Sequence, residues 1–313
     1  MKLQQLRYLT EVARRGLNVS EAAEALFTSQ PGVSKQIRLL EEELGVIVFE
    51  RSGKRLTGVT EPGRAILQIA ERILRETEDI KRVGDEYAGG NSGSLVIATT
   101  HTQARYALPE VVKRFVEGHS DVRLSMHQGN PTQIAEWTIK GEADIAIATE
   151  ALDQYPQLLM LPCYQWAHCV IAPSGHPVLA ESSLSLPALA RWPLITYDPA
   201  FSGRSRIDDA FKRVQLVPNV ILAAADADVI KTYVGLGLGL GIIAGMAFDP
   251  LRDMGLEALA AEHLFGFNTT RIGLRRGRYV RRYEYDFIEL FAGQLTRKAV
   301  DMAMAGGGDE YQL

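Results

Sequence analysis

The sequence has few cysteines and no long apolar run. Cys163 and Cys169 are its two cysteines, too few for a disulfide framework or a four-cysteine zinc site, so we expect two reduced thiols. No stretch approaches the roughly 18 consecutive apolar residues of a membrane-spanning helix. The charged N-terminus lacks the apolar core of a secretory signal peptide. These absences predict a cytoplasmic protein with no membrane partner.

Motifs for catalysis and metal binding are also absent. The six histidines show neither H-x-x-x-H nor H-E-x-x-H spacing, so we predict no metal site. No G-x-S-x-G turn indicates a nucleophile. The run GLGLGLG at 235–241 follows a predicted helix and leads into a strand, whereas a dinucleotide-binding loop follows a strand and opens a helix. The sequence therefore predicts no catalytic residues and no cofactor, and we expect a protein that is not an enzyme.

Charge is unevenly distributed along the chain. The formal net charge is -4 over 313 residues, but residues 1–60 hold nine Lys/Arg against seven Asp/Glu, a net charge of +2. A chain of this length is typical of about two domains. A local basic patch can bind phosphate groups even where the molecule as a whole is acidic. The N-terminal segment is therefore a candidate nucleic-acid-binding domain.

The spacing of apolar residues predicts three short helices at the N-terminus. The first begins near Leu3 and ends near Gly16, and Ser20 is expected to cap a second helix over 21–27. TSQPG interrupts the pattern, and a third helix over 33–44 resumes it with four side chains inward, Val33, Ile37, Leu40 and Leu44. Two short helices joined by a tight turn form a helix-turn-helix, whose second helix can enter a DNA major groove.

The candidate DNA-binding residues carry hydroxyl, amide or basic groups on the exposed side of this motif. They are Ser20, Thr28, Ser29, Gln30, Pro31, Ser34, Lys35 and Arg38. Such groups can bond base edges or phosphates, and a helix N-terminus itself favours a phosphate. The alternative is that Thr28 or Ser29 only caps the helix and that the basic residues form a solvated face.

A basic hairpin is predicted to follow. VIVFERSGKRLTGVT alternates like a strand, turns at Ser52-Gly53 and continues as a second strand. Its basic residues would lie along the DNA backbone and supply affinity without discriminating between base sequences; they are Arg51, Lys54 and Arg55. Residues 1–59 thus read as a winged helix-turn-helix domain that binds double-stranded DNA.

Residues 60–90 read as a long helix. Thr60 is a plausible cap with Pro62 in the first turn. Its apolar residues follow three- and four-residue steps: Ile66, Ile69, Ile73, Ile80, Val83 and Tyr87. Pairing with a second copy of the helix would bury this seam, which predicts a homodimer; the alternative is that the seam packs on its own domain. GGNSGS at 89–94 is expected to be a flexible join.

Residues 91–313 read as an α/β effector-binding domain. Strands and helices alternate as βαβαβ, which predicts a parallel sheet, and a similar run lies between about 164 and 266. A long terminal helix is expected over 281–300. The pattern predicts two lobes, the first about 91–163 with 267–300 and the second about 164–266. A small ligand would bind in the cleft between them, at strand ends.

Polar residues at these strand ends predict an anion site. Thr100, Thr102 and Gln103 follow the first strand, and Thr149 ends the third. Ser202 lies in a turn of the second lobe that opens a helix. Hydroxyls, an amide and free backbone N–H groups would hold an anion without a formal positive charge. The alternative for Thr102 and Ser202 is helix capping alone.

These motifs resemble a known family. LFTSQPGVSKQIRLLEEELGVIVFERSGKRLTGVTEPG is similar to the signature of LysR-type transcriptional regulators, and the resemblance runs from Met1 to about Val300. ATTHTQARYALPEVV and DIAIATEAL resemble the branch that activates cysteine-regulon genes. The resemblance implies an N-terminal winged helix-turn-helix, a linker helix and a two-lobed effector domain like that of periplasmic binding proteins.

The resemblance also implies a ligand and partners. It places a sulfate-like or carboxylate anion on Thr100, Thr102, Gln103, Thr149 and Ser202, with Trp166 as a wall of the pocket. The family motif commonly has Thr where this chain has Ser202, which keeps the hydroxyl and removes a methyl group. The implied inducer is N-acetylserine, with O-acetylserine as its precursor and sulfide or thiosulfate opposing it. The implied partners are promoter DNA, RNA polymerase and further copies of the chain, as a homodimer and homotetramer.

A second hypothesis takes the two-lobed cleft by itself. Such a cleft also suits a cytoplasmic small-anion-binding protein or an enzyme. A winged helix-turn-helix at the N-terminus has no purpose in either, so we expect a transcriptional regulator of sulfur assimilation.

Overall fold

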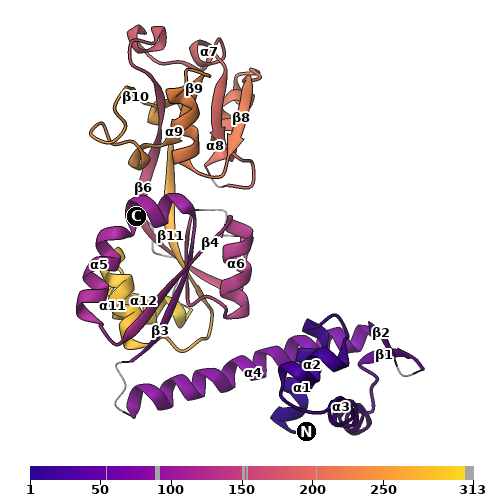
Figure 1. Ribbon diagram of the computed structural model, residues 1–313. Helices are drawn as coiled ribbons and strands as arrows, with labels where there is room; N and C mark the ends of the chain where they lie inside the picture. Colours follow the sequence, from indigo (N-terminus) through magenta and orange to yellow (C-terminus); the bar gives the residue numbers. More distant parts are fainter. Residues whose placement is uncertain (54, 89–91, 150–151, 153, 202, 307–313) are drawn as a thin grey trace. The chain divides into compact units, whose positions relative to one another are not determined.

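The computed structural model describes residues 1–53, 55–88, 92–149, 152, 154–201 and 203–306. The chain divides into two compact units, Met1–Ala88 and Gly89–Leu313, each of which is described by itself (Figure 1). In these described ranges, no helix combines the length and the apolar character that crossing a bilayer requires.

The first unit opens with the predicted winged helix-turn-helix, here called the head. Its elements are α1 (Leu3–Arg14), α2 (Val19–Ala25), α3 (Gln30–Leu44) and the antiparallel hairpin β1 (Phe49–Ser52) and β2 (Arg55–Val59). The apolar side chains that recur at helical spacing build one core; Leu9 and Ile37, for example, are fully buried in it. The fold predicted for this segment is confirmed.

Helix α2 begins earlier than predicted. Asn18, not Ser20, is its cap, because the Asn18 Oδ1 accepts hydrogen bonds from the backbone N–H groups of Ser20 (3.1 Å) and Glu21 (3.2 Å). Asparagine and serine both cap helices well, so composition alone did not separate them. Ser20 lies in the first turn, where its side chain is exposed.

The last turn of α3 also differs from the prediction. Leu44 was expected to point inward but is 40% exposed, whereas Glu41 is buried. Helix α3 ends at Gly45, which has a left-handed backbone (φ 68°), so the chain turns away one residue after Leu44. The inward position near this end is therefore taken by a carboxylate.

Helix α4 (Glu61–Tyr87) begins as the sequence predicts. Thr60 is the cap, and its Oγ1 accepts a 3.0 Å hydrogen bond from the backbone N–H of Gly63. Pro62 occupies the first turn, where it has no hydrogen bond to lose.

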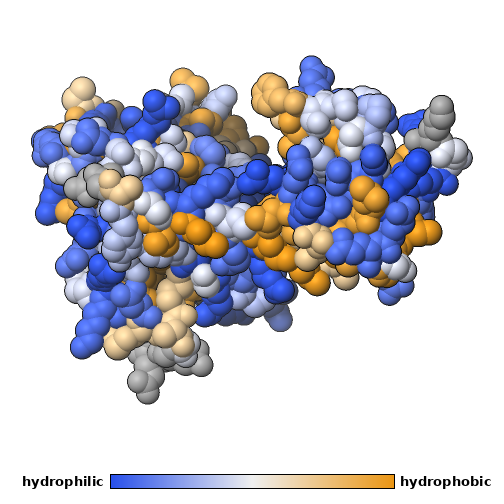
Figure 2. Space-filling model, turned by 90° about the horizontal axis from the view of Figure 1, so that it is seen from below, coloured by the Kyte–Doolittle hydropathy of each residue, from blue (hydrophilic) through white to orange (hydrophobic). Residues whose placement is uncertain are grey.

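The predicted apolar seam of α4 divides into two parts. Ile66 and Ile73 pack against the core of the head, as the alternative interpretation had it. Ile69, Ile80 and Tyr87 remain 48%, 70% and 82% exposed. Hydrophobic side chains are visible at the surface of this unit (Figure 2). This second set is available to another copy of the chain, and Val83, the remaining residue of the seam, is half-buried and not part of the core of the head.

The second unit is built on one mixed sheet. Strands follow the order β4-β3-β5-β11-β6-β9-β7-β8, with β10 beside β6. The strands are β3 (Gly93–Thr99), β4 (Val122–Gln128), β5 (Ile145–Ala148), β6 (Leu158–Pro173), β7 (Leu194–Tyr197), β8 (Val220–Ala224), β9 (Leu240–Ala244), β10 (Leu256–Ala260) and β11 (Phe267–Arg275). Strand β3 runs parallel to β4 and β5, and β7 runs parallel to β8 and β9, as the alternation predicts.

Two antiparallel strands, β6 and β11, run between the lobes (Figure 1). The core of the first lobe contains Cys163, and a core of the second lobe contains Cys169. The sixteen-residue strand β6 therefore crosses from one lobe to the other between these two residues. Both thiols are buried and free, in agreement with the expectation from the sequence.

Helices cover the sheet in both lobes. They are the short π-helix η1 (Gln103–Ala107), α5 (Pro109–Gly118), α6 (Pro131–Lys140), the 3-10 helix η3 (Pro177–Ala180), α7 (Leu186–Leu189), α8 (Arg204–Arg213), α9 (Ala227–Gly235), the 3-10 helix η4 (Gly245–Ala247), α10 (Glu262–Phe265), α11 (Arg282–Phe291) and α12 (Arg297–Met304). GLGLGLG indeed connects α9 to β9. The predicted join at 89–91 lies outside the described residues, and β3 already begins at Gly93.

Two predicted helices are each divided in the structure. The segment after β3 forms η1 first, because the backbone N–H of Leu108 bonds to Gln103, five residues back, before Pro109 opens α5. The terminal helix expected over 281–300 is split into α11 and α12, and Thr296 caps α12 through a 3.4 Å bond from the N–H of Ala299. At both places the apolar periodicity continues, but a residue that starts a new helix divides it: Pro109 opens α5 and Thr296 caps α12.

Candidate functional site

The outer face of α3 presents the predicted DNA-binding side chains. Thr28, Ser29, Gln30, Pro31, Lys35 and Arg38 are exposed, and Ser34 is half-buried. Ser29 is the cap of α3, since its Oγ accepts a 3.3 Å bond from the N–H of Gly32. Gln30 donates from Nε2 to the Oγ of Ser34 at 3.1 Å, which orients the Gln30 amide on the helix surface. Lys35 and Arg38, three residues apart, share the same face.

A hollow in the head gathers residues from separate elements. Ser20 and Gln30, from the starts of α2 and α3, line it together with Arg55 of the hairpin. Arg15 at the end of α1 lines it as well, a residue that the sequence analysis did not select. Arg15 is paired with Glu11 at 2.9 Å, and the carboxylate of Glu21 also lines the hollow, so Arg55, Ser20 and Gln30 are the groups best suited to a DNA phosphate there.

Arg51 has a different role from the one predicted. Its Nη2 lies 2.7 Å from the Oε2 of buried Glu41, so the guanidinium is bound inside the head. The other oxygen of Glu41 accepts hydrogen bonds from the backbone N–H groups of Val48 (2.9 Å) and Phe49 (3.1 Å). Arg51 and Glu41 thus fix the hairpin to α3. Lys54, predicted beside Arg51, lies outside the described residues.

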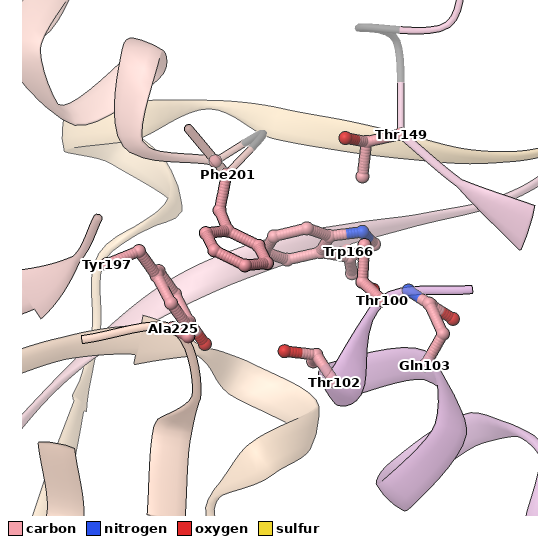
Figure 3. A pocket seen from close by; sticks show the side chains of 9 residues that line it. Thr100, Thr102, Gln103, Thr149, Trp166, Tyr197, Phe201 and Ala225 are labelled. Atoms are coloured by element: carbon pink, nitrogen blue, oxygen red, sulfur yellow. The ribbon is translucent and has the colours of Figure 1, made fainter. Parts of the chain in front are cut away.

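A pocket between the two lobes contains the predicted anion-binding residues (Figure 3). Thr100, Thr102, Gln103, Thr149 and Trp166 all line it. Its volume is about 380 Å³, including space open to solvent. The first three residues follow the end of β3, Thr149 follows β5, and Trp166 lies on β6. Ser202 lies outside the described residues, but its neighbours Phe201 and Gly203 line the same pocket.

The pocket offers uncharged hydrogen-bonding groups. Among the described lining residues, none carries a charge at neutral pH. The Oγ1 of Thr149 and the Nε1 of Trp166 are buried without a hydrogen-bond partner. Thr102 stands at the start of η1 but its side chain makes no capping bond, so capping does not explain this hydroxyl. Buried polar atoms are normally paired, and unpaired ones lining a pocket point to a ligand.

Gln103 supports the pocket rather than offering a free amide. Its Oε1 accepts a hydrogen bond from the Tyr164 hydroxyl, and its Nε2 donates to the Oγ1 of Thr270 at 3.1 Å. The side chain is 1% exposed. Gln103 lines the pocket predicted for it, and its two bonds leave one N–H of Nε2 for a ligand.

Sequence reasoning missed four lining residues of the second lobe. They are Tyr197, Phe201, Gly203 and Ala225. Tyr197 is the last residue of β7, and Ala225 follows β8, so the strand-end rule applied to the first lobe would have found both. Burial raises the pKa of Tyr197, which keeps its phenol protonated, and its oxygen accepts a 3.0 Å bond from the N–H of Ala244.

Charged residues connect the lobes beside the pocket. The hydroxyl of Tyr106, in η1, donates to the Oδ1 of Asp228 on α9 at 2.7 Å. The Nε of Arg105 lies 3.1 Å from the Oδ2 of the same carboxylate. Lys231 lies between Asp228 (3.2 Å) and Asp253 (2.9 Å). We refer to this cluster of Arg105, Tyr106, Asp228, Lys231 and Asp253 as the lobe latch.

The structure also groups three side chains of types that bind metals. Ligand atoms of His101, Asp226 and Asp228 lie within 4.8 Å of one another. The sequence spacing gave no sign of this grouping. Arg105 and Lys231 both lie within 3.2 Å of Asp228, and their positive charges oppose a cation there. We therefore assign no metal to it.

Comparisons with known proteins give one consistent family. The model "Bacterial regulatory helix-turn-helix protein, lysR family" matches residues 3–64, and "LysR substrate binding domain" matches residues 88–296. The chain is 53% identical to the HTH-type transcriptional regulator SsuR of Burkholderia cenocepacia, over 96% of this chain and 97% of that protein. It is 51% identical to the HTH-type transcriptional regulator CysB of the same organism, over the full length of both.

A solved structure resembles the second unit. The crystal structure of the cofactor-binding domain of the Cbl transcriptional regulator is 47% identical in sequence, with a TM-score of 0.66. The match covers 68% of this chain and 93% of that domain. The two-lobed architecture of the second unit is thus shared with the cofactor-binding domain of Cbl.

Proposed function

This chain belongs to the LysR family of bacterial transcriptional regulators, and we propose that it controls genes of sulfur assimilation and cysteine biosynthesis, mainly as an activator. Relatives with the names CysB and SsuR, at 51% and 53% identity over nearly the whole chain, support this assignment. The alternative of a small-anion carrier or an enzyme is not favoured, because both halves of the chain match models of this regulator family.

The observation that carries the proposed ligand class is the set of uncharged donors in the pocket. Thr149 and Trp166 each hold a buried polar atom with no partner among the described residues, and Thr102 adds a hydroxyl that makes no capping bond and is hydrogen-bonded to Tyr197. Neutral donors bind an anion by dipoles, at a smaller desolvation cost than a buried cation would carry. The pocket therefore suits a carboxylate or a sulfate-like anion.

N-acetylserine fits this chemistry better than O-acetylserine does. N-acetylation removes the ammonium group and leaves one carboxylate, one hydroxyl and one acyl oxygen. O-acetylserine keeps its ammonium group, which would need a carboxylate partner, and the described lining of the pocket contains none. We propose N-acetylserine as the inducer, with sulfide, thiosulfate or sulfate-like anions competing for the same donors.

Self-association and DNA binding follow from the first unit. LysR regulators bind promoter DNA through the helix-turn-helix and form oligomers. We propose that Ile69, Ile80 and Tyr87 on α4 form the seam with a second copy, since they are exposed apolar residues on one long helix. We further propose that two dimers form a homotetramer and that the DNA-bound tetramer contacts RNA polymerase.

The test is promoter binding with and without the inducer. Fluorescence anisotropy of a labelled cysteine-gene promoter fragment is measured at two salt concentrations, with N-acetylserine or with L-serine as the control ligand. We expect salt-sensitive, sequence-dependent binding whose affinity or stoichiometry changes with N-acetylserine and not with L-serine. The proposed function would be refuted if the affinity were the same for promoter and unrelated DNA and did not change with N-acetylserine.

A further inference from the structure

His168 on β6 is a buried histidine with one unused ring nitrogen. Its side chain is 1% exposed, and its Nε2 has no hydrogen-bond partner. The other nitrogen, Nδ1, lies 3.4 Å from the amide Nδ2 of Asn268 on β11. Trp166, two residues earlier on the same strand, contacts the His168 ring edge to face at 5.1 Å between centroids.

Asn268 determines which nitrogen of His168 carries the proton. With the amide nitrogen of Asn268 facing Nδ1, as in this structure, Nδ2 donates, Nδ1 accepts and the neutral ring carries its hydrogen on Nε2. Burial, with the positive charge of Arg206 nearby, lowers the pKa of His168 to about 4, so the ring is neutral at physiological pH. His168 therefore offers one uncharged N–H donor that nothing in the described chain uses.

That donor lies directly behind the wall of the pocket. Gly203, which lines the pocket, has a φ of 98°, and a Cβ added to it would lie 3.1 Å from the Nε2 of His168 and 3.4 Å from Trp166. The buried ring nitrogen of His168 is therefore a direct neighbour of Gly203, a residue of the pocket wall. The unpaired Nε1 of Trp166 belongs to the same wall.

We propose that the Nε2–H of His168 is a ligand-binding donor of this pocket, acting with the Nε1–H of Trp166 on oxygen atoms of the bound anion. His168 reaches the anion through one ordered water beside Gly203, which such sites use readily. Both donors come from β6, two residues apart, and both are neutral. The crossing strand β6 thus supplies a pair of ring N–H groups to a pocket that also holds the hydroxyls of Thr100 and Thr102. This inference rests on the proposed function only in requiring that the pocket binds an anion.

Two substitutions of His168 distinguish the effect of losing its N–H donor from the effect of losing its ring. Glutamine places an amide N–H close to the position of Nε2, whereas methionine fills a similar volume without a donor. Affinities of the full-length protein for N-acetylserine and for sodium sulfate are measured by calorimetry, with thermal unfolding as a check on folding. We expect His168→Met to weaken binding roughly 10- to 100-fold, as for a lost bond to a charged acceptor, and His168→Gln to stay within about threefold of the parent.

The outcomes distinguish this inference from the proposed function. Unchanged binding in His168→Met, or an equal loss in His168→Gln, overturns the role of His168. Thr102→Ala with unchanged affinity instead overturns the pocket as the anion site. A measurement without any variant uses protein labelled with ¹⁵N-histidine: we expect a protonated Nε2 in the free protein whose resonance shifts when sodium sulfate is added. A protonated Nδ1, or no shift at saturating sulfate, overturns the inference.

Discussion

The hydroxyl of Tyr106 donates a 2.7 Å hydrogen bond to the carboxylate of Asp228, 122 residues further along the chain. Tyr106 belongs to η1, directly after the pocket residues Thr102 and Gln103, and its ring packs against a core of the second lobe. Asp228 lies in the first turn of α9. We therefore expect a ligand that moves η1 also to move the lobe latch, and with it the second lobe.

Removal of this bond should weaken inducer binding. In Tyr106→Phe the ring still packs, but the link to Asp228 is lost, so we expect about two- to tenfold lower affinity for N-acetylserine, in line with a bond worth about 1 kcal/mol. The hydrogen bonds from Tyr106 and Lys231 outweigh burial and lower the pKa of Asp228, so this carboxylate stays charged. Calorimetry measures the affinity, and Tyr233→Phe, at an exposed tyrosine of α9, is the matched control. Equal affinities in both variants would contradict a role for the latch.

Thr149→Val should separate ligand binding from stability. The Oγ1 of Thr149 bonds to nothing in the described protein, so replacing it with a methyl group should leave the melting temperature unchanged or raise it. Affinity for N-acetylserine should fall roughly tenfold with the lost donor. The control is Thr138→Val, which removes a 2.8 Å bond to the carbonyl of Ile134 far from the pocket and should leave affinity intact. A stability loss at Thr149 without any loss of affinity would contradict the assignment.

Lys35→Ala and Arg38→Ala should weaken promoter binding without altering inducer affinity. Lys35 and Arg38 are exposed on α3. If each contacts a phosphate, its removal should reduce the slope of log affinity against log salt concentration by about one. Lys140→Ala, an exposed lysine of the second unit, serves as the control. Anisotropy titrations at several salt concentrations give the slopes. Slopes identical to that of the parent would exclude phosphate contacts by these residues.

Glu41→Gln should loosen the hairpin of the head. The substitution removes the charge that holds Arg51 and weakens the acceptor for two backbone N–H groups, so we expect a loss of about 1–3 kcal/mol in unfolding free energy. Glu42→Gln, at the exposed neighbour, should have little effect. Calorimetric melting of the two variants makes the comparison, and equal melting temperatures would show that the Arg51 pair contributes nothing.

Acid should destabilise the protein through His168. The folded-state pKa of about 4 lies below the usual value of 6.5, because the buried ring resists protonation. The unfolded chain therefore binds more protons between these values, so stability is lost as pH falls from about 6.5 to 4, by at most about 3 kcal/mol. Urea unfolding as a function of pH measures this loss. His168→Gln should show a smaller slope over the same window, and an unchanged slope would assign the effect elsewhere.

Local chemistry in the sequence determined the secondary structure of the head and the first residues of the pocket. Apolar spacing placed α1 and α3, and a capping threonine placed the start of α4. Thr100, Thr102 and Thr149 could be selected because polar residues at the ends of parallel strands meet at one edge of a sheet. Such signals depend on only a few neighbouring residues, so they can be recognised in the sequence before the tertiary structure is known.

The tertiary structure alone decided which partner each polar group has. Glu41 forms an ion pair with Arg51, Gln103 donates a hydrogen bond to Thr270, and Asn268 contacts the Nδ1 of His168. The last two pairs join residues 167 and 100 positions apart, across strands whose order the sequence does not specify. Hydrogen bonds depend on distances of about 3 Å and on direction, and only the packed chain brings such remote groups to that precision.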